Sequence, residues 1–569
     1  MSQLAGELAR KYETLKSERQ NWITAWDSVA DVFSPYGYRP GQSHDTSTRQ
    51  AILNDKIMET SGVQAARTLA AGMQGGMTSP ARPWFRLRFQ GEDINDQMGG
   101  GWLQDVEDRM QNIFHRSNLY NALHVLYLDM GLYGTGVMVE TADANGLYFR
   151  VLEPGSYVLD GNSRDEVDTL MYSRWLTLRQ LVQEYGKENL PESLRMNLEQ
   201  KGCTMTQTLY EVVQCIYPRK DAVPGSRVKT QMPWASVHLL MQGGNRAPEV
   251  LRESGFQSFP AFCPRWELRD GNVYGYSPAM QAMADNRMLQ AMQRTSIKSW
   301  HRMSDPALSV NAELEKVGID LTPGACNYVS WSGTGQPVAA TPILQADAAS
   351  MQAVEQAKQL IRQQIEQAMY TDLFRMLLDT DRRQITATEI EARQQEKMIL
   401  IGPVVERLDK ELLSPLIERT YQLMAEWDYL PESPQDMEGQ ALRVEFVSVL
   451  AQAQKLVSTS STDHTMAFVA NVAGAMPEIL DNIDPDKLIK AYANSLGAPQ
   501  SIFRDERSRD AIRQQREQAQ AQAQAQEQAQ ASMQTVEGAA AAAKNLGQAP
   551  TGPDGETALS AIIGGLGGL

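Results

Sequence analysis

Apolar residues recur at helical spacing near the start of the chain. In "ERQNWITAWDSVADVFSP", intervals of four, three and four residues separate Trp22, Trp26, Val29 and Phe33. This spacing places the four side chains on one face of an α-helix, and Pro35 ends the helix. We expect the apolar face to pack against another element.

Two helix–turn–strand units follow. In "TSGVQAARTLAAGMQGGMTSPARPWFRLRF", a helical pattern passes through paired glycines and two prolines into a strand that alternates apolar residues with arginines. In "NLYNALHVLYLDMGLYGTGVMVE", a helical stripe leads through Gly131, Gly134 and Gly136 into a second strand. Because these glycines follow a helix instead of opening one, we interpret them as a packing turn, not a dinucleotide loop. Short β-rich runs from Tyr148 to Pro264 predict an antiparallel sheet with inserted helices.

Two long helices flank a β-rich insert in the middle of the chain. Ser277 is an N-cap residue with proline after it, and the first helix continues to Asp305, where a second proline stops it. The insert is rich in Gly/Pro turns and short strands. Apolar residues near heptad spacing then predict a return helix over 347–377.

A third long helix begins in "ITATEIEARQQ". Thr386 and Glu389 fit a capping box, in which each side chain accepts a hydrogen bond from the other residue's backbone amide. Pro403 interrupts the apolar seam that follows, so we expect a kink at 399–403. The strand "LRVEFVSVL" comes next.

The last part of the chain has little apolar periodicity. Residues 506–544 contain a Gln/Ala repetition of strong helix formers without an apolar stripe. Alone, such a segment stays solvated or disordered, whereas copies arranged around a ring could form a barrel of helices. Residues 545–569 are rich in glycine and predict a flexible tail.

The composition is that of an ordinary soluble protein. The 569 residues are 42% hydrophobic and 21% charged, and no run of about 18 apolar residues could span a bilayer. The first residues lack the apolar core of a signal peptide, so we expect a protein that works in the cytoplasm or in a particle assembled there. The net charge of −16 argues against tight DNA binding, because affinity for phosphate comes from clustered Lys and Arg.

No motif of a common enzyme class is present. The sequence lacks a phosphate-binding loop, H-E-x-x-H and G-x-S-x-G, so we expect no catalytic, cofactor-binding or metal site. We interpret the cysteines as buried and reduced, and the histidines as surface or packing residues. These residues are Cys203, Cys215, Cys263 and Cys326, and His44, His115, His124, His238, His301 and His464.

Two basic clusters are the candidate binding sites. The first is Arg382 and Arg383, followed by Gln384, directly before the third helix. The second lies along the last turns of the first long helix and consists of Arg294, Lys298, His301 and Arg302. Either cluster could be solvated charge or ion-pairing residues. Phosphate contact is the alternative, and it requires repetition in space, since one or two arginines per chain give little affinity.

Four blocks in this order resemble the head-to-tail connector, or portal, proteins of short-tailed bacteriophages. The blocks are "ERQNWITAWDSVADVFSP", "AARTLAAGMQGGMTSPARPWFRL", "YLDMGLYGTGVMVE" and "ITATEIEARQQEKMILIGPVVERLDKELLSPLIERTYQLMAEWDYLP". The resemblance implies a predominantly helical α+β portal fold, assembled as a ring of typically twelve copies around a central channel. Because each chain is acidic, such a ring would repel phosphate and let DNA slide, while a few arginines at the narrowest place could slow it.

The resemblance also divides the chain into regions. These are a wing (1–276), stem helix 1 (277–303), a clip (304–346), stem helix 2 (347–377), a tunnel loop (378–386), a kinked wing helix with a return strand (387–457), a crown (458–505), a barrel helix (506–544) and a tail (545–569). In this scheme Arg382, Arg383 and Gln384 lie in the tunnel loop, and Arg294, Lys298 and Arg302 lie along the stem and channel.

The implied partners are those of a capsid vertex. They are further copies of the chain, double-stranded DNA in the channel, the terminase large subunit, the major capsid and scaffolding proteins, and tail adaptor or nozzle proteins, with no membrane. The implied location is the head–tail vertex of the virion, after assembly in the host cytoplasm. Two other functions stay open: an internal virion or scaffolding coiled-coil protein, which would form rods without a channel, and an unrecognised metal-dependent nuclease.

Overall fold

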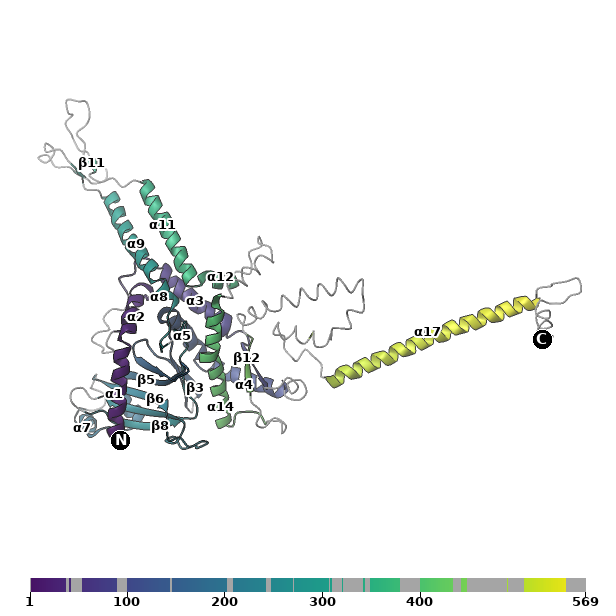
Figure 1. Cartoon of the computed structure of the whole chain (residues 1–569), viewed down its shortest axis with the longest axis horizontal. Helices are drawn as coiled ribbons and strands as arrows, with labels where there is room; N and C mark the ends of the chain where they lie inside the picture. Colours follow the sequence, from purple (N-terminus) through teal and green to yellow (C-terminus); the bar gives the residue numbers. More distant parts are fainter. Residues whose placement is uncertain are drawn as a thin grey trace, which may run out of the picture. The chain divides into compact units, whose positions relative to one another are not determined.

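The computed structural model describes most of the first 432 residues and a long helix near the C-terminus (Figure 1). The described residues are 2–36, 40–41, 54–89, 100–143, 146–201, 208–241, 247–269, 271–305, 308–309, 320, 341–342, 348–378, 400–432, 442–447, 489 and 506–548. The chain forms two compact units, 1–90 with 102–497, and 91–101 with 498–569.

Helices and strands alternate through the described part of the chain. The helices before residue 430 are α1 (Ser2–Glu18), α2 (Gln20–Phe33), α3 (Ser61–Met77), α4 (Gly100–Arg116), α5 (Leu119–Tyr133), α6 (Leu178–Tyr185), α7 (Glu192–Lys201), α8 (Pro278–Gln281), α9 (Met283–Ser304), α11 (Ala348–Ala368), α12 (Thr371–Leu378), a helix over 400–408, the π-helical turn η1 (Asp409–Leu413) and α14 (Ser414–Glu426). The strands are β1 (Phe85–Phe89), β2 (Met138–Asp143), β3 (Gly146–Val151), β4 (Tyr157–Gly161), β5 (Val167–Thr177), β6 (Leu209–Pro218), β7 (Trp234–Met241), β8 (Glu249–Phe256), β9 (Ala261–Phe262), β10 (Leu308–Ser309), β11 (Thr341–Pro342) and β12 (Leu442–Phe446).

The predicted antiparallel sheet is confirmed as five strands in the order β4-β5-β6-β7-β8. Adjacent residues of a strand point to opposite faces, and the two faces have different covers. Val213 packs with Leu8 and Tyr12 of α1, whereas Val212 packs with the apolar residues of α6 and α7. The sheet is therefore buried on both sides, and helices α6 and α7 are the predicted insertions.

The main core surrounds α2, α3 and α5. The predicted face of α2 is confirmed, because Trp26, Val29 and Phe33 are fully buried and Trp22 is packed against the same cluster. Two smaller sheets join this unit, with the strand orders β3-β2-β9 and β1-β12. In the second of these, the predicted strand after residue 440 pairs with β1, with Phe85 opposite Phe446.

The predictions for the two glycine-containing turns have different outcomes. Gly134 ends α5 with φ of 79°, and its amide donates to the carbonyl of Met130 at 2.9 Å, so the packing turn is confirmed. The paired glycines Gly75 and Gly76 do not form a turn, because α3 continues through them to Met77. A buried face that packs α3 against α5 holds these glycines in the helix.

Each of the two long middle helices is interrupted once. Ala282, with ψ of 0°, separates α8 from α9. The predicted helix over 347–377 bends at Tyr370, where φ is +55°, and continues as α12. This bend places Phe374 against Gly72 of α3, where a Cβ atom on the glycine would clash with the phenylalanine ring. Packing on α3 therefore prevails over the helical pattern.

The apolar seam of the third helix is confirmed from residue 400 onward, where Ile401, Leu408 and Leu412 are fully buried. The kink expected at 399–403 is partly outside the described residues, although 400–403 are helical. An irregularity that the pattern did not predict is η1, directly before Pro415. Proline has no amide hydrogen to donate and clashes with the carbonyl four residues earlier, which explains a widened turn there.

Helix α17 (Glu506–Gln548) covers the Gln/Ala segment and extends four residues beyond it, so the segment is helical in the single chain, where a solvated or disordered segment was expected. Its apolar side chains are exposed, for example Met533 at 71% and Val536 at 67%. This exposure fits a helix without an apolar stripe. The assembly of this helix into a barrel stays a prediction.

The N-cap at Ser277 provides a test of the start of the first long helix. Its buried Oγ accepts from the amide of Met280 at 3.0 Å and donates to the carbonyl of Leu132 at 2.7 Å. We expect Ser277→Ala to lower the free energy of unfolding by about 1–2 kcal/mol, because both partners lose a hydrogen bond. Urea unfolding measures this, and the exposed Ser350→Ala is the control; equal stability of the two variants would contradict the capping role.

Candidate functional site

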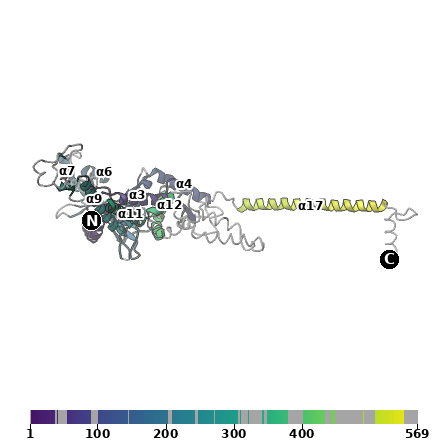
Figure 2. The ribbon, with the colours of Figure 1, turned by 90° about the horizontal axis from the view of Figure 1, so that it is seen from above.

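Helices α9 and α11 form an antiparallel hairpin that extends from the main core (Figure 1), and they also lie next to each other when seen from above (Figure 2). At its tip, Leu308 pairs with Pro342 in the short β10–β11 ladder. The remainder of the predicted β-rich insert, apart from residue 320, is outside the described residues. The order of long helix, β pairing and return helix is therefore present.

A buried lysine joins the two helices of the hairpin. The Lys358 side chain is 2% exposed, and its Nζ lies 2.6 Å from a carboxylate oxygen of Glu355. The same Nζ donates to Oε1 of Gln293 at 3.0 Å and lies 5.7 Å from the centre of the Trp300 ring. These contacts compensate the charge of an ammonium group buried between two helices.

The root of the hairpin is fixed to the segment before α3. Oε1 of Gln290 accepts from the amides of Met58 and Glu59 at 2.8 and 3.0 Å. From the other helix, Nε of Arg362 donates to Oε1 of Glu59 at 3.3 Å. Both helices therefore contact Glu59, which marks one side of the hairpin.

The predicted basic cluster lies on the face of α9 that points away from α11. Arg294, Lys298 and Arg302 are all exposed, and the intervals of four residues keep them on one face over about 12 Å of helix. Among the described residues, no acid forms an ion pair with these three. Arg287, seven residues before Arg294, and His301 lie on the same face and are also exposed. Arg287 is seven residues, or two helical turns, before Arg294, and this spacing in the sequence is enough to include Arg287 in the basic cluster.

The structure does not test the second basic cluster. Arg382, Arg383 and Gln384 fall within 379–399, outside the described residues, between the end of α12 and the helix whose described part begins at residue 400. Their assignment to a channel loop stays a prediction.

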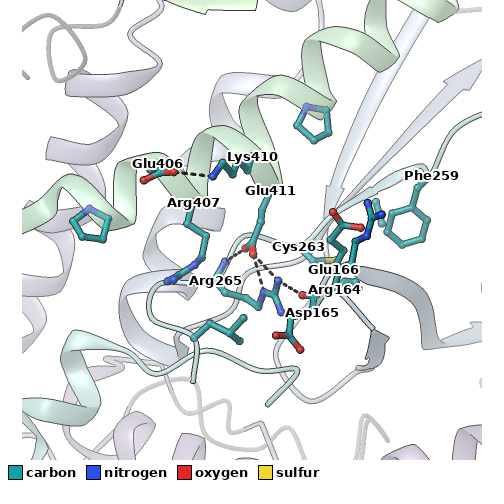
Figure 3. A pocket seen from close by; sticks show the side chains of 15 residues that line it. Arg164, Asp165, Glu166, Phe259, Cys263, Arg265, Glu406, Arg407, Lys410 and Glu411 are labelled. Atoms are coloured by element: carbon teal, nitrogen blue, oxygen red, sulfur yellow. Dashed lines mark hydrogen bonds and ion pairs between the residues drawn. The ribbon is translucent and has the colours of Figure 1, made fainter. Parts of the chain in front are cut away.

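A cavity of about 660 Å³ lies between the β4–β5 turn, the segment after β8 and the helix over 400–415 (Figure 3). The main polar contact in the lining of this cavity is between Arg265 and Glu411. The backbone amide of Arg265 donates to Oε2 of Glu411 at 2.8 Å, and Nε of Arg265 donates to Oε1 of Glu411 at 3.1 Å. Arg407 donates to the carbonyl of Trp266, and Lys410 pairs with Glu406. The charged groups of the lining are thus largely engaged with one another, and we assign the cavity a structural role.

The described part of the chain contains no group of three His, Cys, Asp or Glu residues that could hold a metal ion. Cys215 and Cys263 are buried and free, as predicted. His238 is buried and its Nδ1 lies 2.9 Å from the Tyr185 hydroxyl, and burial lowers the pKa of His238 to about 4. It is a packing residue in a hydrogen-bonded pair. No helix in the described ranges is both long and apolar enough to cross a membrane.

Comparisons with known proteins agree on one family. The family described as "Bacteriophage head to tail connecting protein" matches residues 5–503. The "Probable portal protein" of Bordetella phage BPP-1 is 35% identical over 514 residues, and the "Portal protein" of Salmonella phage epsilon15 is 33% identical over 512 residues, each covering 90% of both chains. A solved chain from "Virion of native gene transfer agent (GTA) particle" matches over 73% of this chain and 91% of that chain, with 12% identity and a TM-score of 0.32.

Proposed function

The chain belongs to the family of bacteriophage head-to-tail connecting proteins, and from this premise we propose how it works as a portal protein at the capsid vertex. A portal is a structural protein that forms the passage through which the genome enters and leaves the head. The observation that carries the proposal is the family membership over nearly the whole chain.

The proposed assembly is a ring of copies around a channel, typically twelve, as the family membership implies. In this proposal α8 and α9 (277–303) and α11 and α12 (347–377) are the stem, and the insert with β10 and β11 (304–346) is the clip. The elements of 1–276 and 387–457 are the wing, and 378–386 is the tunnel loop. Residues 458–505 form the crown and α17 contributes to a barrel. A hairpin that extends from the core and is basic on its outward face suits a channel wall better than a compact enzyme.

The proposed partners follow from this position. The clip docks the terminase large subunit during packaging and tail adaptor or nozzle proteins afterwards, while the wing contacts capsid and scaffolding proteins. Terminase supplies the ATP hydrolysis, and the portal itself catalyses no reaction. The protein assembles in the host cytoplasm and stays in the virion at the head–tail vertex.

Double-stranded DNA in the channel meets two sets of basic residues. The exposed face of α9 with Arg294, Lys298 and Arg302 lines the channel within the stem. The loop with Arg382 and Arg383 projects into the channel. Ring symmetry multiplies each cation, so a few positions per chain can slow a duplex that the acidic remainder repels.

The loop is tested by changing both arginines. We expect particles with Arg382→Ala/Arg383→Ala portals to retain less packaged DNA than the parent, because a ring of cations is removed from the narrowest point. The measurement is the DNA content of purified heads, with the channel conductance of isolated rings as a second readout. Unchanged DNA content and conductance would contradict the proposed role.

A further inference from the structure

Beyond Asp285 in the first turn of α9, one flank of the α9–α11 hairpin carries no charged side chain. The residues of this flank are Met288, Met292, Thr295, Ser299 and Met303 on α9, and Ser350, Ala353, Ala357, Leu360 and Gln364 on α11. Successive residues on each helix are three or four positions apart, so they lie along one side of that helix. We call these ten residues the uncharged flank.

The uncharged flank is accessible in the single chain. Met288 and Met303 are each 47% exposed and Leu360 is 63% exposed. The other seven residues are exposed or half-buried. Near the root, Met292 is packed against the main core. Farther along the hairpin, the flank stays accessible in the described part of the single chain.

Both helical stripes lie on the same side of the hairpin. Successive residues of an α-helix are rotated by about 100°, so on α9 Thr295 lies roughly 140° from Gln290. On α11, Leu360 lies about 160° from Arg362 by the same geometry. Because Gln290 and Arg362 both contact Glu59, the two stripes lie together on the side opposite Glu59.

The residue types suit a helical protein partner better than nucleic acid. The spacing of three and four residues is that of helix–helix packing, and Ala, Ser and Thr allow close approach. DNA would require cations, and those are on the neighbouring face of α9, with Arg294 and Lys298. A repeated pattern of methionine, leucine and small residues that stays exposed has an unfavourable contact with water, which a partner would remove.

We infer that the uncharged flank packs against the stem hairpin of the next copy in the ring. The inference rests on the proposed function, which supplies neighbouring copies on both sides of each hairpin. If the basic face of α9 points to the channel and α11 lies outside it, the uncharged flank points around the ring. The contact is head-to-tail, so the uncharged flank of one copy meets the opposite flank of the next copy, which is the side that contacts Glu59. Ile297, two turns beyond Gln290, and Gln359, one turn before Arg362, lie on that opposite flank.

Charged substitutions test the flank. We expect Thr295→Glu/Leu360→Glu to reduce the ring fraction at least tenfold in sedimentation, because ring closure buries two carboxylates per contact. The control Gln356→Glu/Gln363→Glu makes the same charge change at exposed positions on the outer face of α11 and should form rings like the parent. Far-UV circular dichroism and thermal unfolding should be alike for the separate chains, since all four positions are exposed or outside the core.

Cross-linking gives an independent readout in the folded ring. Thr295→Cys/Ile297→Cys places two thiols on opposite sides of α9, so a bismaleimide reagent can join them only between copies. We expect a ladder of covalent multimers that the parent chain does not give. Rings in the glutamate variant together with no ladder would overturn the inference, whereas a parent chain that forms no rings at all would overturn the proposed function as well.

Discussion

Replacing Arg294, Lys298 and Arg302 with glutamine is expected to weaken duplex binding by assembled rings by about tenfold or more at low salt. Removing one phosphate-binding cation also reduces the slope of log affinity against log salt by about 0.9. The three side chains are exposed on one face of α9 and have no acidic partner among the described residues. Fluorescence anisotropy of a short labelled duplex, titrated at several salt concentrations, measures both quantities.

The control for this experiment changes the same amount of charge elsewhere. Lys220, Arg227 and Lys229 are exposed in the connection between β6 and β7, and their replacement by glutamine also adds three to the negative charge of each chain. If the two triple variants lose affinity equally, the effect belongs to net charge and the stem is not the DNA-facing surface.

At a pH well above the pKa of Glu140, Arg419→Met is expected to lower the free energy of unfolding by about 3–5 kcal/mol, because it leaves a carboxylate buried without its counter-charge. Nε of Arg419, on α14, lies 2.9 Å from Oε2 of Glu140, on β2, and the two side chains are 6% and 0% exposed. Arg419 also donates to the carbonyl and hydroxyl of Ser258. Urea unfolding of the single chain gives the measurement.

The pH dependence identifies the cause of this destabilisation. Burial raises the pKa of Glu140 to about 7, although Arg419 counteracts the rise. A raised carboxyl pKa favours the folded state at low pH and loses that advantage as pH increases through the folded pKa. Below about pH 7, Glu140 is protonated in both folded proteins. Without Arg419 the pKa of Glu140 rises further, so the deficit of Arg419→Met should grow as the pH increases above about 7.

Two further variants separate charge burial from packing. Glu140→Gln/Arg419→Met should recover most of the stability and remove the pH dependence, since no buried charge is left. Arg174→Met breaks an ion pair with Glu184 whose side chains are 21% and 30% exposed, and it should cost only about 1 kcal/mol. A destabilisation of Arg419→Met that is independent of pH would attribute the effect to packing.

The sequence predicts the long helices and strands of this fold well, because the spacing of their apolar residues indicates which side chains are buried. The spacing of Trp26, Val29 and Phe33 indicates a buried face that the structure confirms. The bend at Tyr370 could not be predicted, since it depends on Phe374 meeting Gly72 of a helix some 300 residues earlier. Local periodicity contains no information about such a distant contact.

The candidate site was predictable to a similar extent. Basic residues at helical spacing gave Arg294, Lys298 and Arg302, and the exposed face of α9 confirms that they lie together. Lys358 gave no signal, because a lysine among glutamines predicts a solvated position, and only the partner helix supplies Gln293 and Trp300. The uncharged flank likewise emerges only when the contacts with Glu59 place the two stripes on one side.

Negative-stain electron microscopy of the purified full-length chain tests the central claim most directly. A portal protein should give uniform rings with a central hole, typically with twelvefold symmetry in the averaged end-on views. Single chains, or rods without a channel, at every protein concentration tested would contradict the portal assignment.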